Sequence, residues 1–187
     1  MRGKLGVQPS DVPTIVTERL LLRPPTAGDL DAWTQRIFAD PRVTRYIPSP
    51  VTEPRARAER MLAFVSNLWS QRGYGEWLVT DRASGELLGH CGLAYIAATD
   101  EVEIDYALAP LFWGRGIATE AVRACLRFGF ETARLAQVIG LVVPENTPSR
   151  RVLEKVGFAY QRDAPYFGHM LALYTLPSER FLAADEG

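Results

Sequence analysis

Two stretches of the sequence carry residue types and spacings that support chemistry. The first, residues 114–119, reads Gly-Arg-Gly-Ile-Ala-Thr and joins a strand-like run to an apolar helix pattern. Small residues on alternate positions let a ligand approach the N–H groups at a helix N-terminus, where the helix dipole also favours negative charge. The turn therefore predicts a pyrophosphate site, to which Thr119 adds a hydroxyl and Arg115 a mobile positive charge.

The same strand–turn–helix layout also occurs in P-loops and in dinucleotide-binding folds. A P-loop needs a lysine after its second glycine, and no lysine lies between Gly114 and Glu120. A dinucleotide fingerprint needs a glycine where Thr119 stands and an acid about 20 positions on, at the end of the next strand, but that strand ends too late, at Val143. A tight strand-to-helix connection without a ligand is the structural alternative. Two glycines and an alanine on alternate residues favour the phosphate.

The second stretch is the strand predicted over residues 101–109. Side chains alternate along a strand, so Glu101, Glu103 and Asp105 share one face and apolar or aromatic residues fill the other. Three acids buried without cations would repel one another. A solvated face is therefore the alternative to an acid–base site, and it is the expectation for Glu101 at the start of the strand.

The elements that position these residues follow from hydrophobic periodicity and turn signals. A helix is expected from Thr26, with Asp29 completing a capping box. Strand, apolar helix and apolar strand around the glycine turn form a parallel crossover unit. Further strands are expected at 17–25, 75–96 (a hairpin), 136–146, 158–162 and 166–176, further helices at 53–72 and 146–157, and a loop at 40–54. The fold class is α/β with a mixed sheet.

Composition limits the partners and the compartment. The chain has 187 residues with a net charge of −1, which gives no electrostatic case for nucleic acid. No apolar run approaches the ~18 residues of a membrane span, and residues 1–13 lack the apolar region of a secretory signal. Two cysteines and two histidines make no metal-ligand cluster. We expect a cytoplasmic protein without metal: a flexible arm (1–13), one domain (14–177) and a C-terminal tail (178–187).

Cys91 is the other residue with reactive chemistry. An acyl-cysteine would need a base, and the adjacent His90 points to the opposite strand face. We therefore expect Cys91 to be a buried thiol that packs in the sheet.

The turn also carries a family resemblance. Residues 113–118, Trp-Gly-Arg-Gly-Ile-Ala, resemble the Gln/Arg-x-x-Gly-x-Gly/Ala signature of the GNAT superfamily of acyl-CoA-dependent N-acetyltransferases, with Trp113 in place of the first residue. Three blocks are similar to the branch that contains the ribosomal-protein N-terminal acetyltransferases, and the resemblance runs from about Thr17 to Leu176. The blocks are TERLLLRP at 17–24, EIDYALAPLFWGRGIATEA at 103–121 and PENTPSRRVLEKVGF at 144–158.

The resemblance implies a fold and a co-substrate. The sheet would have six to seven strands flanked by about four helices, and its two central parallel strands, 101–109 and 137–143, would splay apart. Acetyl-CoA would place its pantetheine in the splay and its pyrophosphate on the glycine turn. The Asn146 side chain would bind the pantetheine, although Asn146 can also simply cap its helix. The implied cofactor-binding residues are Ala107, Leu108, Ala109, Trp113, Gly114, Arg115, Gly116, Ile117, Ala118, Thr119 and Asn146.

The resemblance also implies catalytic residues. Glu103 would act as general base through water, with Asp105 as the second choice or as a binder of the amine's charge. Many family members have a tyrosine where Leu153 stands, so Ser149 is the substitute acid that this branch suggests. Ser149 can also be a routine polar residue of the first helical turn. The remaining alternatives for the acid are Tyr160, Tyr166, water, or departure of the thiolate unaided.

The partners would be acetyl-CoA and an amine, either a protein N-terminus or a small molecule; a homodimer stays open. Trp33, Tyr46 and five arginines lie where the acceptor loops would be, and most of the arginines are expected to be solvated. These arginines are Arg42, Arg45, Arg55, Arg57 and Arg60. Two rival functions are a coenzyme A-binding sensor that has lost transfer and a nucleotide-binding dehydrogenase domain. The incomplete fingerprint argues against the latter.

Overall fold

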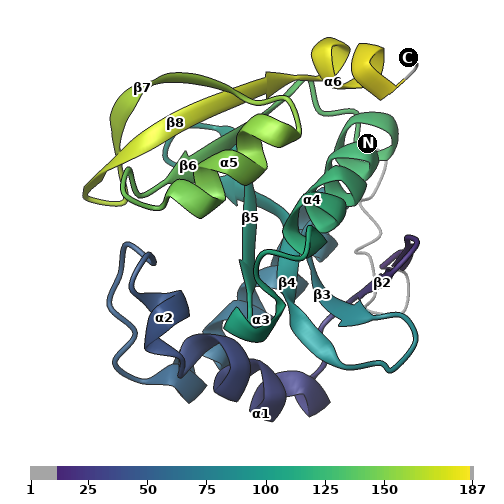
Figure 1. Ribbon diagram of the computed structural model, residues 1–187, viewed down its shortest axis with the longest axis vertical. Helices are drawn as coiled ribbons and strands as arrows, with labels where there is room; N and C mark the ends of the chain where they lie inside the picture. The colour runs from purple at the N-terminus through teal and green to yellow at the C-terminus, as the bar shows by residue number, and fades with distance from the viewer. Residues whose placement is uncertain (1–11, 186–187) are drawn as a thin grey trace, which may run out of the picture.

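The strands form one mixed sheet in the computed structural model, which describes residues 12–185 (Figure 1). The strand order is β1-β2-β3-β4-β5-β6-β8-β7. Every neighbouring pair is antiparallel except β5 and β6. The strands are β1 (Ile15–Val16), β2 (Leu20–Arg23), β3 (Glu76–Asp81), β4 (Leu87–Ile96), β5 (Glu101–Leu108), β6 (Gln137–Val142), β7 (Ala159–Tyr166) and β8 (His169–Pro177).

The predicted splay lies between the two parallel strands. Glu103 and Ile139 are the only register pair between β5 and β6. On the other side of β5, pairing with β4 runs from Ile96–Glu101 to Gly89–Leu108. The C-terminal half of β5 therefore keeps one paired edge and one open edge, as the resemblance implied.

Six α-helices accompany the sheet within residues 12–185, and the fold class is confirmed. They are α1 (Leu30–Trp33), α2 (Pro41–Thr44), α3 (Pro54–Arg72), α4 (Ile117–Arg127), α5 (Thr147–Lys155) and α6 (Ser178–Asp185). In Figure 1, α5 lies on the half of the sheet that contains β6, β7 and β8, while α1, α2 and α3 gather at the opposite end of the molecule. The described chain thus has one strand and two helices more than the sequence predicted.

The helix boundaries have local causes. Thr26 donates from its backbone N–H and its hydroxyl to Asp29 Oδ2, at 2.8 and 2.7 Å, which confirms the predicted capping box. The loop expected over 40–54 contains α2, because Asp40 accepts from the N–H of Arg42 and Pro41 is suited to the first helical position. Helix α3 ends at Gly73, whose φ of 73° is left-handed.

The C-terminal segment differs from the tail that the sequence predicted. Residues 178–185 form α6, and its Phe181 packs against Phe130 with ring centres 5.3 Å apart. At the other end, residues 1–11 of the expected arm lie outside the described part of the chain. Val12 is buried, and the carbonyl of Pro13 accepts a hydrogen bond from Trp77 Nε1 at 2.7 Å. Among the described helices, none combines the length and apolarity that a membrane crossing requires.

Candidate active site

A cavity of about 1050 Å³ joins the two stretches that the sequence singled out. Its walls come from the C-terminal half of β5, the glycine turn with the first residues of α4, the N-terminal turns of α5, and segments of α2 and α3. This volume is at the upper end of the usual range for small-molecule sites, roughly 300–1,000 Å³. The cavity thus has room for an elongated ligand together with a second, smaller molecule.

The glycine turn forms one end of the cavity. Gly114 and Gly116 have φ of 75° and 77°, the left-handed region that side chains rarely adopt. Gly116 caps α4, so the first N–H groups of a helix of 11 residues follow directly. Of the residues predicted here, Trp113, Gly114 and 116–119 line the cavity, whereas Arg115 does not. The expected contribution of the Arg115 side chain to this wall is therefore not found.

A set of polar contacts holds the turn in place. Arg19 Nη1 donates to the carbonyl of Arg115 at 2.9 Å. Glu120 Oε1 accepts from the Thr17 hydroxyl at 2.6 Å, and Glu120 Oε2 accepts from Arg19 Nε at 2.6 Å. Trp113 Nε1 donates to the carbonyl of Leu108 at 2.7 Å. The tryptophan that replaces the usual Gln or Arg thus links the turn to the end of β5.

The open edge of β5 forms the next part of the wall. Ala107 and Leu108 line the cavity, but Ala109 does not, and its N–H donates to the carbonyl of Leu88 at 2.8 Å. Because successive residues of a strand direct their N–H groups to opposite sides, the N–H of Leu108 points to the splayed edge. The prediction for Ala109 is therefore corrected, since its donor is already used within the sheet.

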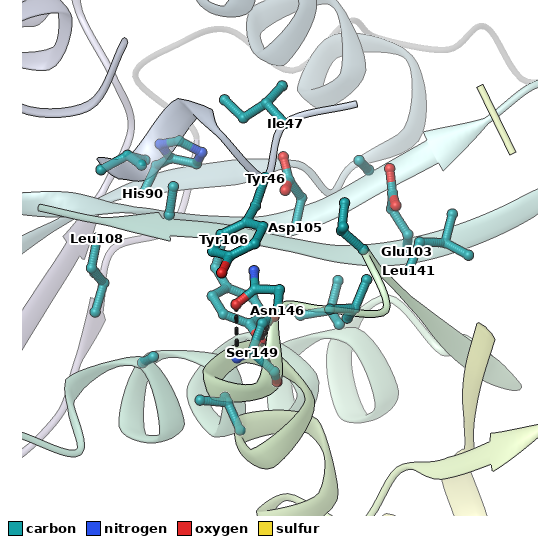
Figure 2. A pocket seen from close by; sticks show the side chains of 18 of the residues that line it. Tyr46, Ile47, His90, Glu103, Asp105, Tyr106, Leu108, Leu141, Asn146 and Ser149 are labelled. Carbon is teal, nitrogen blue, oxygen red and sulfur yellow. Dashed lines mark hydrogen bonds between the residues drawn. The ribbon is translucent and has the colours of Figure 1, made fainter. Parts of the chain in front are cut away.

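Opposite faces of β5 carry different chemistry (Figure 2). Glu103 and Asp105 point to one side of the strand, while Tyr106 points to the other, toward Asn146 and Ser149. The Tyr106 hydroxyl oxygen lies 2.7 Å from Ser149 Oγ and donates to the Ser149 carbonyl at 3.1 Å. Burial raises the pKa of Tyr106 above its ordinary value, so its hydroxyl stays protonated.

Tyr106 is a site residue that the sequence pattern did not indicate. Alternation along β5 placed it on the apolar face, but α5, the helix that follows β6, brings Asn146 and Ser149 at its N-terminus to that face. Asn146 Oδ1 accepts from the N–H of Ser149 at 3.3 Å, which is the capping role considered for it. Asn146 and Ser149 both line the cavity. A ligand-binding role for Asn146 stays a prediction.

Glu103 has the environment of a base that works near neutral pH. Burial, followed by the nearby charge of Asp105, raises the pKa of Glu103 to about 8. Both residues line the cavity. Glu101, two positions earlier, does not line it and accepts from the Tyr166 hydroxyl at 2.8 Å. A carboxyl with a pKa near the working pH is suited to proton transfer.

The alternative acids Tyr160 and Tyr166 lie away from the cavity wall. Tyr160 donates to Asp163 Oδ1 at 3.1 Å, and Tyr166 donates to Glu101. Neither side chain lines the cavity. Leu153, the residue expected to replace a tyrosine, is buried and lines it.

A second acidic residue was missed because it comes from another strand. Glu76 on β3 pairs with Gly92 on β4, and Gly92 pairs with Asp105 on β5, so the two acids flank a residue without a side chain. Glu76 is 1% exposed, and neither carboxyl oxygen has a hydrogen-bond partner among the described residues. Burial and the charges of Asp105 and Glu103 hold the pKa of Glu76 well above its ordinary value.

His90 belongs to the same cluster. Trp33 Nε1 donates to His90 Nδ1 at 2.9 Å, and burial lowers the pKa of His90. The ring is therefore neutral, with its proton on Nε2. Ligand atoms of Glu76, His90 and Asp105 lie within 4.8 Å of one another. With one ring nitrogen bonded to the indole and the other protonated, His90 has no lone pair left for a metal.

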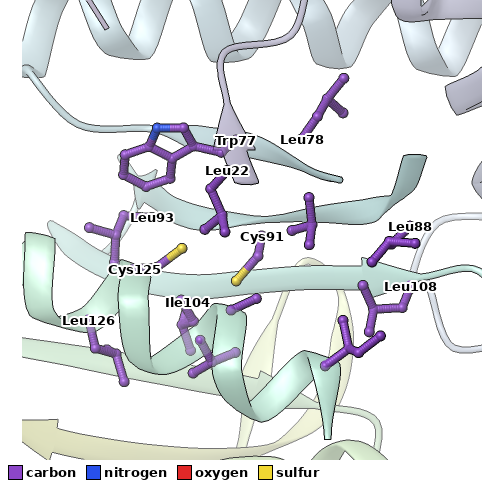
Figure 3. Packing of buried hydrophobic residues seen from close by; sticks show 14 of the residues in the cluster. Leu22, Trp77, Leu78, Leu88, Cys91, Leu93, Ile104, Leu108, Cys125 and Leu126 are labelled. Carbon is purple, nitrogen blue, oxygen red and sulfur yellow. The ribbon is translucent and has the colours of Figure 1, made fainter. Parts of the chain in front are cut away.

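Cys91 points away from this cluster, as predicted. It is fully buried next to the free thiol of Cys125 on α4, among apolar residues such as Leu93 and Ile104 (Figure 3). Burial raises the pKa of the Cys91 thiol well above its ordinary value, so little thiolate forms. Cys91 is a packing residue.

The splayed mixed sheet and the glycine turn at the N-terminus of α4 agree with the fold of an acetyltransferase. The domain model described as Acetyltransferase (GNAT) domain matches residues 19–159, and the chain belongs to this family. The family uses acetyl-CoA as its co-substrate.

Relatives and solved structures agree with this assignment. The uncharacterized protein YkkB of Bacillus subtilis (strain 168) is 35% identical over 167 residues, 86% of this chain and 93% of that one. YdaF of the same organism, named provisionally as a ribosomal N-acetyltransferase, is 28% identical over 159 residues, 73% of this chain and 87% of that one. The crystal structure of an acetyltransferase from Agrobacterium tumefaciens str. C58 superposes with a TM-score of 0.79, at 28% identity, and covers 88% of this chain and 94% of that one.

Proposed function

We propose that this acetyltransferase transfers the acetyl group of acetyl-CoA directly to a primary amine within a ternary complex. One observation carries the proposal: a single cavity connects the helix N-terminus at Gly116 with the carboxyl of Glu103. The cavity thus connects an anion-binding end with a proton-accepting end. No metal is part of the proposed reaction.

The coenzyme would bind along the splay and the turn. Its pyrophosphate would accept hydrogen bonds from the N–H groups that follow Gly116, where the dipole of α4 adds to the attraction. Arg151 and Lys155 on α5 line the same cavity and supply positive charge for further phosphate groups. The pantetheine would run along the open edge of β5, where the Leu108 N–H is directed outward, and would reach Asn146. The thioester would then lie near Glu103 and Ser149.

Glu103 would take the proton of the attacking amine through water. The amine nitrogen attacks the thioester carbon, the C–S bond breaks, and the amine proton passes to the Glu103 carboxylate. A base with a pKa of about 8 is far better matched to an ammonium group than an ordinary glutamate. Asp105 on the same face is the second candidate for this role. Backbone N–H groups of the splayed edge would stabilise the negative charge on the thioester oxygen.

Ser149 would assist the departing thiolate by hydrogen bonding. The raised pKa of Tyr106 makes it a donor that stays protonated. If the single proton of the Tyr106 hydroxyl turns from the Ser149 carbonyl to Ser149 Oγ, 2.7 Å away, the Ser149 hydroxyl is available to donate toward the sulfur. A thiol of pKa about 8.5 leaves readily as thiolate, so a hydrogen bond suffices and no full proton transfer is needed. We therefore propose that Tyr106 acts together with Ser149 in this role.

Two acceptor classes agree with the reaction. The name of YdaF points to a ribosomal acceptor, for which we propose a protein N-terminal α-amine, and the cavity also has room for a small-molecule amine. We propose a cytoplasmic location, in agreement with two cysteines that are both free thiols.

Thermal unfolding with acetyl-CoA tests the binding step. At 100 times Kd, a ligand adds about 2.7 kcal/mol of stability, which for a chain of this size is roughly 5–11 °C in Tm. We expect this rise with acetyl-CoA and none with NAD. Mass spectrometry of incubated amines then tests transfer. Stabilisation without acetylation of any amine would indicate a coenzyme A-binding sensor and refute the proposed reaction.

A further inference from the structure

Helix α3 presents two kinds of arginine to its surroundings. Arg55 forms ion pairs with Asp31 and, at 2.8 Å, with Glu59, and it does not line the cavity. Arg57, two residues further along the helix, and Arg60 both line the cavity. Among the described residues, neither of these two forms an ion pair. The helix therefore directs these two guanidinium groups toward the cavity.

The other arginines at this end of the cavity are already engaged. Arg42 binds the carboxylate of Asp40 through Nε and Nη2, at 3.0 and 2.6 Å. Arg45 lies 4.4 Å from the ring centre of Tyr46 and donates to its hydroxyl at 2.8 Å. Within the described chain, Arg57 and Arg60 are thus the two of these four cavity-lining arginines that lack such partners.

Arg57 is the more informative of the two. Its Nε is buried and has no hydrogen-bond partner among the described residues. A buried donor without a partner is costly, so such groups indicate a missing acceptor. Glu76 lies near enough to interact with the charge of Arg57, but burial favours the neutral form of Glu76 and no ion pair forms between them. Because Arg57 also lines the cavity, a molecule bound there could supply an acceptor for its guanidinium group.

The cavity thus combines two opposite requirements. Glu103 and Asp105 form an acidic wall suited to an amine, and Arg57 and Arg60 form a basic wall suited to an anion. Guanidinium groups bind carboxylates with paired, charge-assisted hydrogen bonds. The carbonyl of a peptide N-terminus carries no charge, so a peptide could supply a counter-ion only through an acidic side chain, whereas a free amino acid always carries a carboxylate.

We infer that the acceptor is a small amino acid-type molecule, whose free carboxylate binds Arg57 and Arg60 while its amine faces Glu103. This inference rests on the proposed acetylation of an amine. It selects a small zwitterion over a protein N-terminus. Met61 and Phe64 of α3 also line the cavity, and their apolar side chains would contact the rest of the molecule.

Matched amines test the charge requirement. The probes are glycine, L-leucine and L-phenylalanine, each against its amide, which keeps the amine and mimics a peptide N-terminus. We expect kcat/KM for at least one acid to exceed that of its amide by about tenfold or more, the usual scale of a charge-assisted pair. If no acid is preferred over its amide, while amines are acetylated, the inference is overturned and the proposed reaction stands.

Variants of α3 assign the preference to the arginines. Arg57→Gln should reduce the acid-to-amide ratio toward one, and Arg57→Lys should keep part of it because the charge remains. Arg55→Gln is the matched control, since Arg55 lies on the same helix outside the cavity. Equal loss of the ratio in Arg57→Gln and Arg55→Gln would overturn the assignment.

A binding measurement covers the case of a protein without turnover. The Tm of the acetyl-CoA-loaded protein is followed with each acid and each amide. A rise with an acid that is absent with its amide and absent in Arg57→Gln supports the anion site even where no acetyl group is transferred, which separates this site from the proposed reaction. If neither turnover nor Tm distinguishes acids from amides, the inference is refuted.

Discussion

The hydroxyl oxygens of Tyr106 on β5 and Ser149 on α5 lie 2.7 Å apart, although 43 residues separate them in the chain. Strand β6 lies beside β5, and the helix that follows it, α5, places its first turn near the face of β5 that carries Tyr106. A pair of hydroxyls therefore stands near Leu153, which occupies the position of the usual tyrosine. This pair is the part of the proposed site that depends most on tertiary structure.

Removing either hydroxyl should slow transfer. For Tyr106→Phe and Ser149→Ala we expect kcat to fall by about 10- to 100-fold, because each loses a hydrogen bond to the developing thiolate or to its donor. The Kd for acetyl-CoA should change little. Stopped-time acetylation and titration with acetyl-CoA measure the two quantities. The double variant should cost little more than either single one, since the two hydroxyls act as one unit. Additive losses would contradict the pairing.

Activity should follow the ionisation of Glu103. Its pKa of about 8 means that the carboxylate form increases as the pH rises from 7 to 9. We expect kcat/KM to increase over this range. Glu103→Gln should lower kcat by roughly 10²–10⁴-fold, the usual contribution of a general base. Glu101→Gln, on the same strand but outside the cavity, is the control. A pH profile that is unchanged in Glu103→Gln would assign the base elsewhere.

The same group should make the folded state sensitive to alkaline pH. In the fold Glu103 holds its proton up to about pH 8, whereas in the unfolded chain it loses it near pH 4.5. The stability linked to this group is therefore complete below pH 4.5 and is lost as the pH rises toward 8. Relative to the wild type, Glu103→Gln should gain roughly 2–5 kcal/mol between pH 5 and pH 9. Urea unfolding at both pH values measures this difference, and a constant difference would contradict it.

Alanine substitutions at two glycines separate the cost of backbone strain from the loss of ligand binding. Gly116 and Gly73 have nearly the same left-handed φ, 77° and 73°, but only Gly116 lies in the cavity wall. Each alanine substitution should lower the free energy of unfolding by about 1–2 kcal/mol. Only Gly116→Ala should also weaken acetyl-CoA binding, because the added methyl group lies where the phosphate approaches the backbone. Equal affinities in the two variants would exclude this turn as the phosphate site.

Local signals predicted the parts of the site that local structure builds. The glycine turn, the alternation along β5 and the capping position of Asn146 depend on neighbours in sequence, and each lies where it was expected. The prediction for Ala109 was wrong because its N–H donates to the carbonyl of Leu88 on the neighbouring strand β4. Arg115 does not line the cavity, and its role in binding the pyrophosphate stays a prediction.

The residues that were missed come together only through the register of the sheet. Glu76 and His90 lie on β3 and β4, and nothing in their own segments indicates that Gly92 leaves space between Glu76 and Asp105. Helix α6 was likewise missed because its stability comes from the contact of Phe181 with Phe130. The arginines of α3 were expected to be solvated, and sequence alone could not separate the ion-paired Arg55 from Arg57.

The single pairing of β5 with β6 has a mechanical consequence. Strands β1–β5 and β6–β8 form two parts of the sheet that pair only at Glu103 and Ile139. The proposed pantetheine, lying along the open edge of β5, would add a second connection between these two parts. The bound coenzyme would then contribute to the stability of the fold as well as to the reaction. Without acetyl-CoA, β5 and β6 would be joined by this one pairing alone and would separate more easily. If the coenzyme connects the two parts in this way, hydrogen exchange at the β6 amides should be slower with coenzyme than without it.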